Sequence, residues 1–170
     1  EAHFAPIYQI TLSANPLEGG SVSGGGTYVE GKEITVSASP GNHYVFDKWT
    51  EAGEQVASDS SYTFTVQDKR DLTAHFSKEQ YNVSLAASPT GAGSVSGEGT
   101  YRYGEEVTLG ASSNEDYIFE AWITDGDTIS SDTSCTFTIT QDTSFEAHFA
   151  PIYQITLSAN PLEGGSVSGG

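Results

Sequence analysis

An internal repeat with a spacing of 73 residues constrains the fold of this chain more than any other feature of its sequence. Residues 8–76 align with residues 81–149 without a gap, and 30 of the 69 paired positions are identical. A repeat that keeps its length along its whole extent indicates that each copy is one structural unit. We therefore expect two tandem modules of about 70 residues rather than one domain of 170.

The two ends of the chain carry one identical passage. Residues 1–25 and 146–170 match letter for letter at an offset of 145, whereas the neighbouring modules match at fewer than half of their positions. This difference indicates a higher-order repeat of two unlike modules. We expect the chain to be a segment of a longer array, whose incomplete end modules are completed by a neighbouring copy, either in the same chain or in another molecule joined head to tail.

The repeat predicts the division of the chain into modules and connectors. The expected segments are the closing strand of a preceding module with its connector (1–7), a first module (8–76), a connector (77–80), a second module (81–149), a connector (150–152) and the start of a further module (153–170). Connectors of three or four residues limit the relative motion of neighbouring units. We therefore expect a linear, semi-rigid array.

Alternating hydrophobicity predicts a mainly β fold in each module. In the stretch YQITLSA, Tyr8, Ile10, Leu12 and Ala14 share one face, which is the period of a half-buried strand. Similar alternation recurs near residues 34–38, 62–66 and 72–76, and Gly and Pro separate the runs. The dipeptides Ala52-Gly53 and Asp125-Gly126 occupy equivalent positions after a Trp, so a hairpin is expected there in each module.

Recurring aromatic residues are expected to form the core of each module. A unit of this size has little apolar surface to bury, and each buried ring stabilises it by about 1.5 to 3 kcal/mol. An alternative role for the same rings is a platform on which sugars stack. The residues concerned are Tyr44, Phe46, Trp49, Phe64 and Phe76 in the first module and Tyr117, Phe119, Trp122, Phe137 and Phe149 in the second.

The charge balance disfavours two classes of partner. The chain has 23 acidic and 6 basic residues, a formal net charge of −17. A surface this negative repels phosphate backbones and anionic lipids, so neither nucleic-acid binding nor membrane binding by basic residues is expected. The longest apolar run is too short to span a membrane. The single cysteine, Cys135, rules out an internal disulfide framework.

The order of motifs resembles a known repeat family. The stretch GGSVSGGGTY, the segment YVFDKW and the closing YTFTVQDKRDLTAHF occur in this order in the first module and recur with substitutions in the second. They resemble the divergent internalin-B-type repeat of secreted and surface-anchored bacterial proteins. The resemblance implies a small β module with a β-grasp-like layout, an extracellular location, and a spacer or adhesive role without catalytic residues.

Candidate catalytic groups do not recur in both modules in a way that supports an enzyme. The stretch GGSVSGG has Val where a hydrolase nucleophile elbow needs Ser, and Gly91-Ala92-Gly93 precedes a strand rather than a helix, unlike a phosphate-binding loop. The histidine at His3, His75 and His148 does recur. Alternation places it opposite the inward residues Ala74 and Phe76, so we expect it to face solvent and not to bind a metal.

The acidic residues raise the alternative of bound calcium. Asp125, Asp127 and Asp132 lie in the stretch TDGDTISSD, but they lack the spacing and terminal Glu of an EF-hand loop, and the first module does not repeat them. No cofactor is therefore expected, with calcium kept as the alternative. Asn82-Val83-Ser84 matches the N-glycosylation sequon by sequence.

These observations favour a structural function over catalysis. The leading hypothesis is an extracellular stalk or filament on a microbial surface, built from tandem β modules that associate with neighbouring repeats or with other copies head to tail. The alternative is an adhesin or a carbohydrate-binding accessory module of a larger secreted protein, with a host or glycan ligand. An exposed strip of aromatic residues would favour binding, and buried aromatic residues would favour the stalk.

Overall fold

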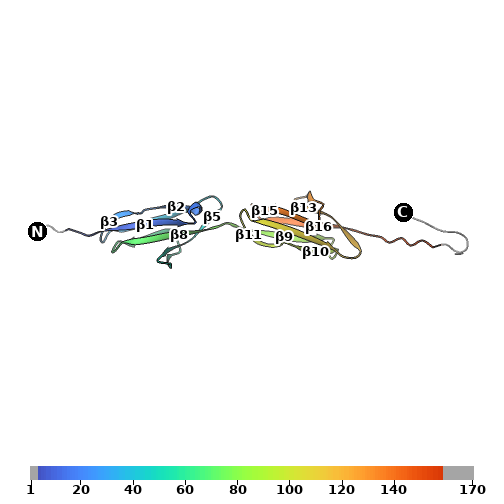
Figure 1. Ribbon diagram of the computed structural model, residues 1–170, viewed down its shortest axis with the longest axis horizontal. Coiled ribbons are helices and arrows are strands. Elements are labelled where there is room, and N and C mark those ends of the chain that lie inside the picture. The colour runs from blue at the N-terminus through green and yellow to red at the C-terminus, as the bar shows by residue number, and fades with distance from the viewer. Residues whose placement is uncertain (1–3, 159–170) are drawn as a thin grey trace. The chain divides into compact units, whose positions relative to one another are not determined.

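The computed structural model describes residues 4–158 and divides after Gln80 into two compact units. Figure 1 shows the first unit in blue to green and the second in green to orange. Each unit holds eight strands among the described residues and no α-helix. The fold is thus mainly β, with two modules of about 70 residues in tandem, as the repeat predicts.

The strands follow the same order in both modules. The first contains β1 (Ile7–Asn15), β2 (Gly20–Ser23), β3 (Gly26–Val29), β4 (Glu33–Pro40), β5 (Tyr44–Glu51), β6 (Glu54–Ala57), β7 (Ser61–Thr65) and β8 (Arg70–Lys78), with a 3₁₀ turn η1 (Leu17–Gly19) after β1. The second contains β9 (Gln80–Ser88), β10 (Gly93–Ser96), β11 (Gly99–Arg102), β12 (Glu106–Ser113), β13 (Tyr117–Thr124), β14 (Asp127–Ser130), β15 (Ser134–Thr138) and β16 (Thr143–Pro151).

Each module has two sheets. The first module has a five-stranded sheet in the order β3-β1-β8-β5-β6 and a three-stranded sheet in the order β2-β4-β7. The second repeats this topology with β11-β9-β16-β13-β14 and β10-β12-β15. The expected hairpins are confirmed: β5 pairs with β6 and β13 with β14, across turns in which Ala52, Gly53, Asp125 and Gly126 have positive φ.

The first and last strands of each module are parallel neighbours at the centre of the five-stranded sheet. β1 pairs with β8 from Ile10 opposite Arg70 to Asn15 opposite His75, and β9 pairs with β16 in the same way. Because the two strands run in the same direction, the chain enters each module at one end and leaves it at the other. The sequence pattern did not predict this pairing, since alternation along a strand carries no information about its neighbours.

The connectors between strands are shorter than the expected segments 77–80 and 150–152. β8 continues through Lys78 and β9 begins at Gln80, so only Glu79 lies between them, while β16 continues through Pro151. The sequence-based boundary followed the last inward aromatic residue of each module. Backbone pairing with β5 and β13 continues for two residues beyond it, which extends both strands.

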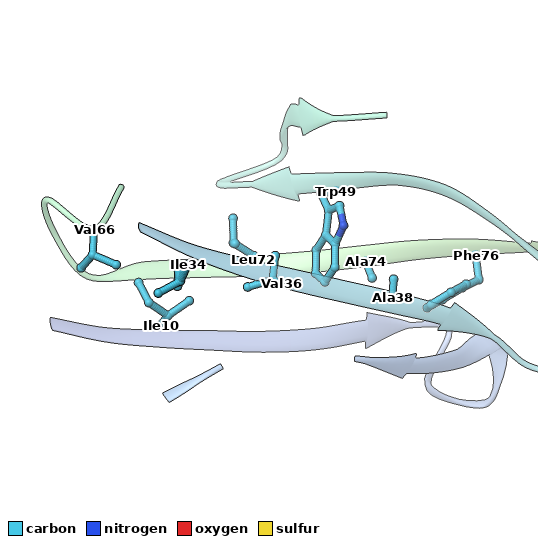
Figure 2. Packing of buried hydrophobic residues seen from close by; sticks show 9 residues of the cluster. All are labelled: Ile10, Ile34, Val36, Ala38, Trp49, Val66, Leu72, Ala74 and Phe76. Atoms are coloured by element: carbon cyan, nitrogen blue, oxygen red, sulfur yellow. The ribbon is translucent and has the colours of Figure 1, made fainter. Parts of the chain in front are cut away.

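The hydrophobic core lies between the two sheets. Figure 2 shows Trp49 at the centre of the first module, fully buried among side chains from both layers. The inward residues expected from alternation on β1, β4, β7 and β8 are confirmed, and a corresponding cluster surrounds Trp122 in the second module. The buried members of the first cluster are Ile10, Ile34, Val36, Ala38, Trp49, Val66, Leu72, Ala74 and Phe76.

Gly20 allows β2 to approach the core closely. A methyl group added to it would lie 2.5 Å from the carbonyl oxygen of Ser39 and 2.7 Å from the ring of Phe76. Gly93 holds the same position in the second module, with equally short distances to Ser112 and Phe149. Both glycines are therefore required by packing between the sheets.

Replacing Gly20 with alanine is expected to lower the free energy of unfolding of the first module by about 1 to 3 kcal/mol, because the added methyl group overpacks the contact with Phe76. Urea unfolding with hydrogen exchange resolved by module measures this loss. The matched control is Gly41→Ala, because a methyl group added there lies 3.3 Å from its nearest neighbour, the carbonyl oxygen of Glu18, and the second module carries Asn114 at the equivalent position. Equal losses for the two variants would contradict the packing argument.

Candidate functional site

The recurring histidine lies on the outer face of the five-stranded sheet in each module. His75 is on β8 between the buried residues Ala74 and Phe76, and its Nε2 lies 2.9 Å from Thr50 Oγ1. His148 Nε2 pairs with Glu146 Oε1 on the same strand, β16. His3 lies outside the described residues. The two histidines thus share a position and differ in their partners.

The structure spreads the calcium candidates along one hairpin and the loop that follows it. Asp125 is in the turn between β13 and β14, Asp127 begins β14, and Asp132 comes after the strand, where its backbone N–H donates to Ser130 Oγ. Within residues 4–158, no group of three or more His, Cys, Asp or Glu side chains is placed to hold a metal ion. This region therefore offers no preformed calcium site among the described residues.

Asn82 and Cys135 have different surroundings. Asn82 is exposed on β9, where its Oδ1 accepts a hydrogen bond of 2.7 Å from Thr100 Oγ1. Cys135 is half-buried on β15 and packs against the second core.

The aromatic residues of the modules line the two cores. Trp49, Phe76, Trp122 and Phe149 are buried. The remaining six of the expected set are half-buried and pack against the same clusters: Tyr44, Phe46, Phe64, Tyr117, Phe119 and Phe137. Among residues 4–158, the exposed aromatic side chains are Phe4 and Tyr153, which lie outside both modules. The modules therefore present no strip of exposed rings in the part of the chain that the structure describes.

A shallow hollow of 530 Å³ lies on the outer face of the five-stranded sheet of the second module. Ile123 and Ala86 contribute apolar surface, and Glu146, His148 and Asp125 contribute polar groups. The corresponding positions of Glu146 and Ile123 in the first module are Thr73 and Thr50. The lining of the hollow thus differs from the first module at Glu146 and Ile123, whereas His148 recurs as His75.

An ion pair with two aromatic neighbours joins the sheets of the first module. Arg70, at the start of β8, donates to Glu51 through Nε and Nη2, with the shortest distance 2.6 Å, and through Nη1 to the hydroxyl oxygen of Tyr62 at 3.1 Å. Its guanidinium carbon lies 4.4 Å from the centroid of the Phe64 ring. Such a stacked, bidentate geometry is specific to arginine.

The surroundings of Arg70 raise its pKa above the usual value, first through the hydrogen bond to Glu51, while burial acts in the opposite direction. A raised pKa stabilises the folded state fully at every pH below the ordinary pKa of arginine, and this contribution is lost only as the pH rises through the folded-state pKa. The guanidinium therefore contributes as a permanent charge.

The second module replaces the whole network. The positions of Glu51, Tyr62 and Arg70 are taken by Thr124, Cys135 and Thr143. There, Phe137 instead stacks edge-to-face on Phe145, with ring centroids 4.6 Å apart. The sequence contained a signal for the Arg70 network, because Glu51, Tyr62 and Arg70 lie far apart in the first module and all three are replaced in the second.

The two tryptophans also differ in their polar contact. Trp49 Nε1 donates to the carbonyl oxygen of Ser60 at 3.2 Å. Trp122 Nε1 is buried without a hydrogen-bond partner among the described residues. A buried donor without a partner destabilises the folded state, so the two modules are unequal at the centre of their cores.

Replacing Arg70 with methionine is expected to lower the free energy of unfolding of the first module by about 1 to 3 kcal/mol, because a carboxylate and a hydroxyl lose a charged donor. The second module should be unaffected. Thermal unfolding followed by hydrogen exchange of each module measures both effects. Lys69→Met is the control, since it removes the same charge from the adjacent, exposed position. A loss as large in the control would assign the effect to net charge instead.

A family model describes most of the chain. The divergent InlB B-repeat domain matches residues 10–80 and again residues 83–153. No curated protein and no solved structure matches the chain significantly. Repeats of this family are typical of bacterial surface proteins, and none of the described residues forms a helix that could cross a membrane. Two consecutive matches cover the two modules seen in the structure, and the chain therefore belongs to the divergent InlB B-repeat domain family.

Proposed function

We propose that the chain is a non-catalytic structural part of a bacterial surface protein, in which tandem modules form an extracellular stalk or filament. The observation that carries this proposal is the parallel pairing of the first and last strands in each module. Tension applied along the chain pulls β1 and β8 in opposite directions along their common axis. All the hydrogen bonds between them then bear the load together, which is the geometry that resists a pulling force.

The connection between the modules supports the same role. Only Glu79 separates β8 from β9, so the chain from Lys78 to Gln80 spans at most about 7 Å. The backbone N–H of Glu79 donates to the carbonyl oxygen of His43 at 2.9 Å, which ties the connector to the first module. A load on the chain therefore passes from one strand to the next without a flexible tether.

Association with a neighbouring copy is part of the proposal. Residues 153–158 have the sequence of residues 8–13 in β1, yet they form no strand, and Tyr153 and Ile155 are 83% and 82% exposed. In β1 the same residues lie between β3 and β8. We infer that residues 153–158 become a strand when a further copy supplies these neighbours, in cis or head to tail. The rest of this segment, from residue 159, lies outside the described residues.

Force spectroscopy on the full chain tests the stalk. With Cys135→Ser as background, handles on Ala5→Cys and Lys78→Cys pull β1 and β8 in shear. Handles on Ala5→Cys and Gln67→Cys instead peel β1 from β8 at one end, so that the bonds break one after another. The first geometry is expected to need the higher unfolding force, because forced unfolding follows the height of the unfolding barrier. Equal forces in the two geometries would refute a load-bearing role for the parallel pair.

A binding role is the second candidate, and the hollow beside Glu146 and His148 is the observation that favours it. Ligand sites are concave and combine apolar surface with a few polar groups. A glycan array probed with the full chain tests this role. Binding that is lost in Ile123→Thr, which restores the residue of the first module, would support an adhesin. An array without hits would leave the structural role as the better account.

A further inference from the structure

The three-stranded sheet of each module ends at an unprotected edge. β7 pairs with β4 alone and β15 pairs with β12 alone. Their sequences, SYTFT and SCTFT, contain no charge, no proline and no glycine. Natural proteins protect exposed edges with such residues or with bulges, because unpaired backbone groups bind another strand. Both modules therefore lack the usual protection at the same place.

The hydrogen bonds that flank β7 determine which of its backbone groups face outward. Ala38 N donates to Ser60 O at 2.9 Å, and Val66 N donates to Lys32 O at 2.8 Å. Bonded pairs alternate along an antiparallel ladder, so residues 62 and 64 also bond to β4. The backbone N–H and C=O groups of Ser61, Thr63 and Thr65 therefore point away from the sheet.

The second module has the same arrangement. Ala111 N donates to Thr133 O, and Ile139 N donates to Glu105 O, both at 2.8 Å. By the same alternation, the backbone groups of Ser134, Thr136 and Thr138 face outward from β15. Each module thus presents three consecutive outward positions, and all six of these residues are exposed and carry hydroxyl groups.

The other edges of the modules are less suited to pairing. β6 and β14 carry Glu54 and Asp127, and β11 carries Arg102. β2, β3 and β10 are uncharged but shorter than β7 and β15, and β2 lies against β1. On a chain with a net charge of −17, β7 and β15 are thus the longest uncharged edge strands among residues 4–158.

We propose that β7 and β15 are the edges through which two copies of this chain pair side by side, as antiparallel strands. Thr63 lies opposite Thr63 of the second copy, and Ser61 lies opposite Thr65, so all three outward positions meet outward positions. β15 forms a separate pair of the same kind around Thr136, on a two-fold axis of its own. The partner is a second copy because the edge is complementary to itself, and an interface of this kind closes on a two-fold axis.

The side chains support this register. Within each module the outer face already carries hydroxyl pairs across the ladder, with Thr35 Oγ1 2.7 Å from Thr63 Oγ1 and Thr108 Oγ1 2.8 Å from Thr136 Oγ1. Pairing between copies joins each row of two hydroxyls to the same row of the second copy, so that four hydroxyls lie side by side. Threonine pairs of this kind stabilise neighbouring strands, whereas like charges directly opposite destabilise them. Side-by-side pairing is distinct from head-to-tail completion and does not depend on it.

Sedimentation equilibrium and amide exchange of the wild-type chain provide the first test. Association should increase with protein concentration and with added salt, since salt screens the repulsion between two acidic copies. In the same samples, the amides of Ser61, Thr63, Thr65, Ser134, Thr136 and Thr138 should become protected. A chain that stays monomeric at high concentration and high salt would overturn the proposal. Protection confined to residues 153–158 would also overturn it, and would support head-to-tail completion instead.

A pair of matched variants provides the second test. Thr63→Asp with Thr136→Asp places like charges opposite each other at the centre of both edges, and should weaken association about tenfold or more. The control is Thr35→Asp with Thr108→Asp, which breaks the same two hydroxyl pairs and adds the same charge to the same face, but on the central strands. The control should associate like the wild type. Pairing through these edges would be refuted if the two variants weakened association equally, or if the edge variant did not weaken it at all. It would also be refuted if the chain associated only in the presence of a foreign protein.

Discussion

The parallel pair formed by the first and last strands is the interaction on which the rest of each module depends. β1 and β8 lie at the centre of the five-stranded sheet, and they contribute Ile10, Leu72, Ala74 and Phe76 to the core. Every other strand of the sheet is added to one side of this pair or the other. Because contacts between the two strands join residues about 60 positions apart, a module holds together only when its whole length is present. The repeat of 73 residues is thus the repeat of a cooperative unit.

The two modules keep this framework and solve local packing differently. The first fills the space between its sheets near Phe64 with the guanidinium of Arg70, held by Glu51 and Tyr62. The second places Phe145 there against Phe137. An ion pair with satisfied hydrogen bonds thus occupies this place in the first module, and an edge-to-face pair of rings occupies it in the second. The two modules therefore share one topology and differ in the chemistry of these contacts.

Features that repeat in both modules and features that differ point to different roles. The edge strands β7 and β15 are both uncharged and both carry outward hydroxyl groups. Their sequences differ at one position, Tyr62 in β7 and Cys135 in β15, and both of these side chains face the core. A property shared by every module of an array adds up along its length. The Arg70 network, by contrast, belongs to the first module alone of the two that the structure describes. The proposed side-by-side pairing and the proposed role of the parallel strands under load both rest on features that the two modules share.

The sequence by itself determined the module length, the strand faces and most of the core, because these depend on local alternation and on the comparison of two copies. Ile10, Val36 and Leu72 were inward by period two, and the hairpin after each tryptophan followed from its turn residues. Only the tertiary structure decided which strands are neighbours. Alternation of inward and outward residues is the same in parallel and antiparallel pairs. The sequence pattern therefore does not predict the β1–β8 pairing, which strands form the free edges, or the continuation of β8 to Lys78. Residues 8–13 and 153–158 illustrate the reason, because they have the same sequence. Residues 8–13 form a strand, since β3 and β8 supply its hydrogen bonds, whereas residues 153–158 do not.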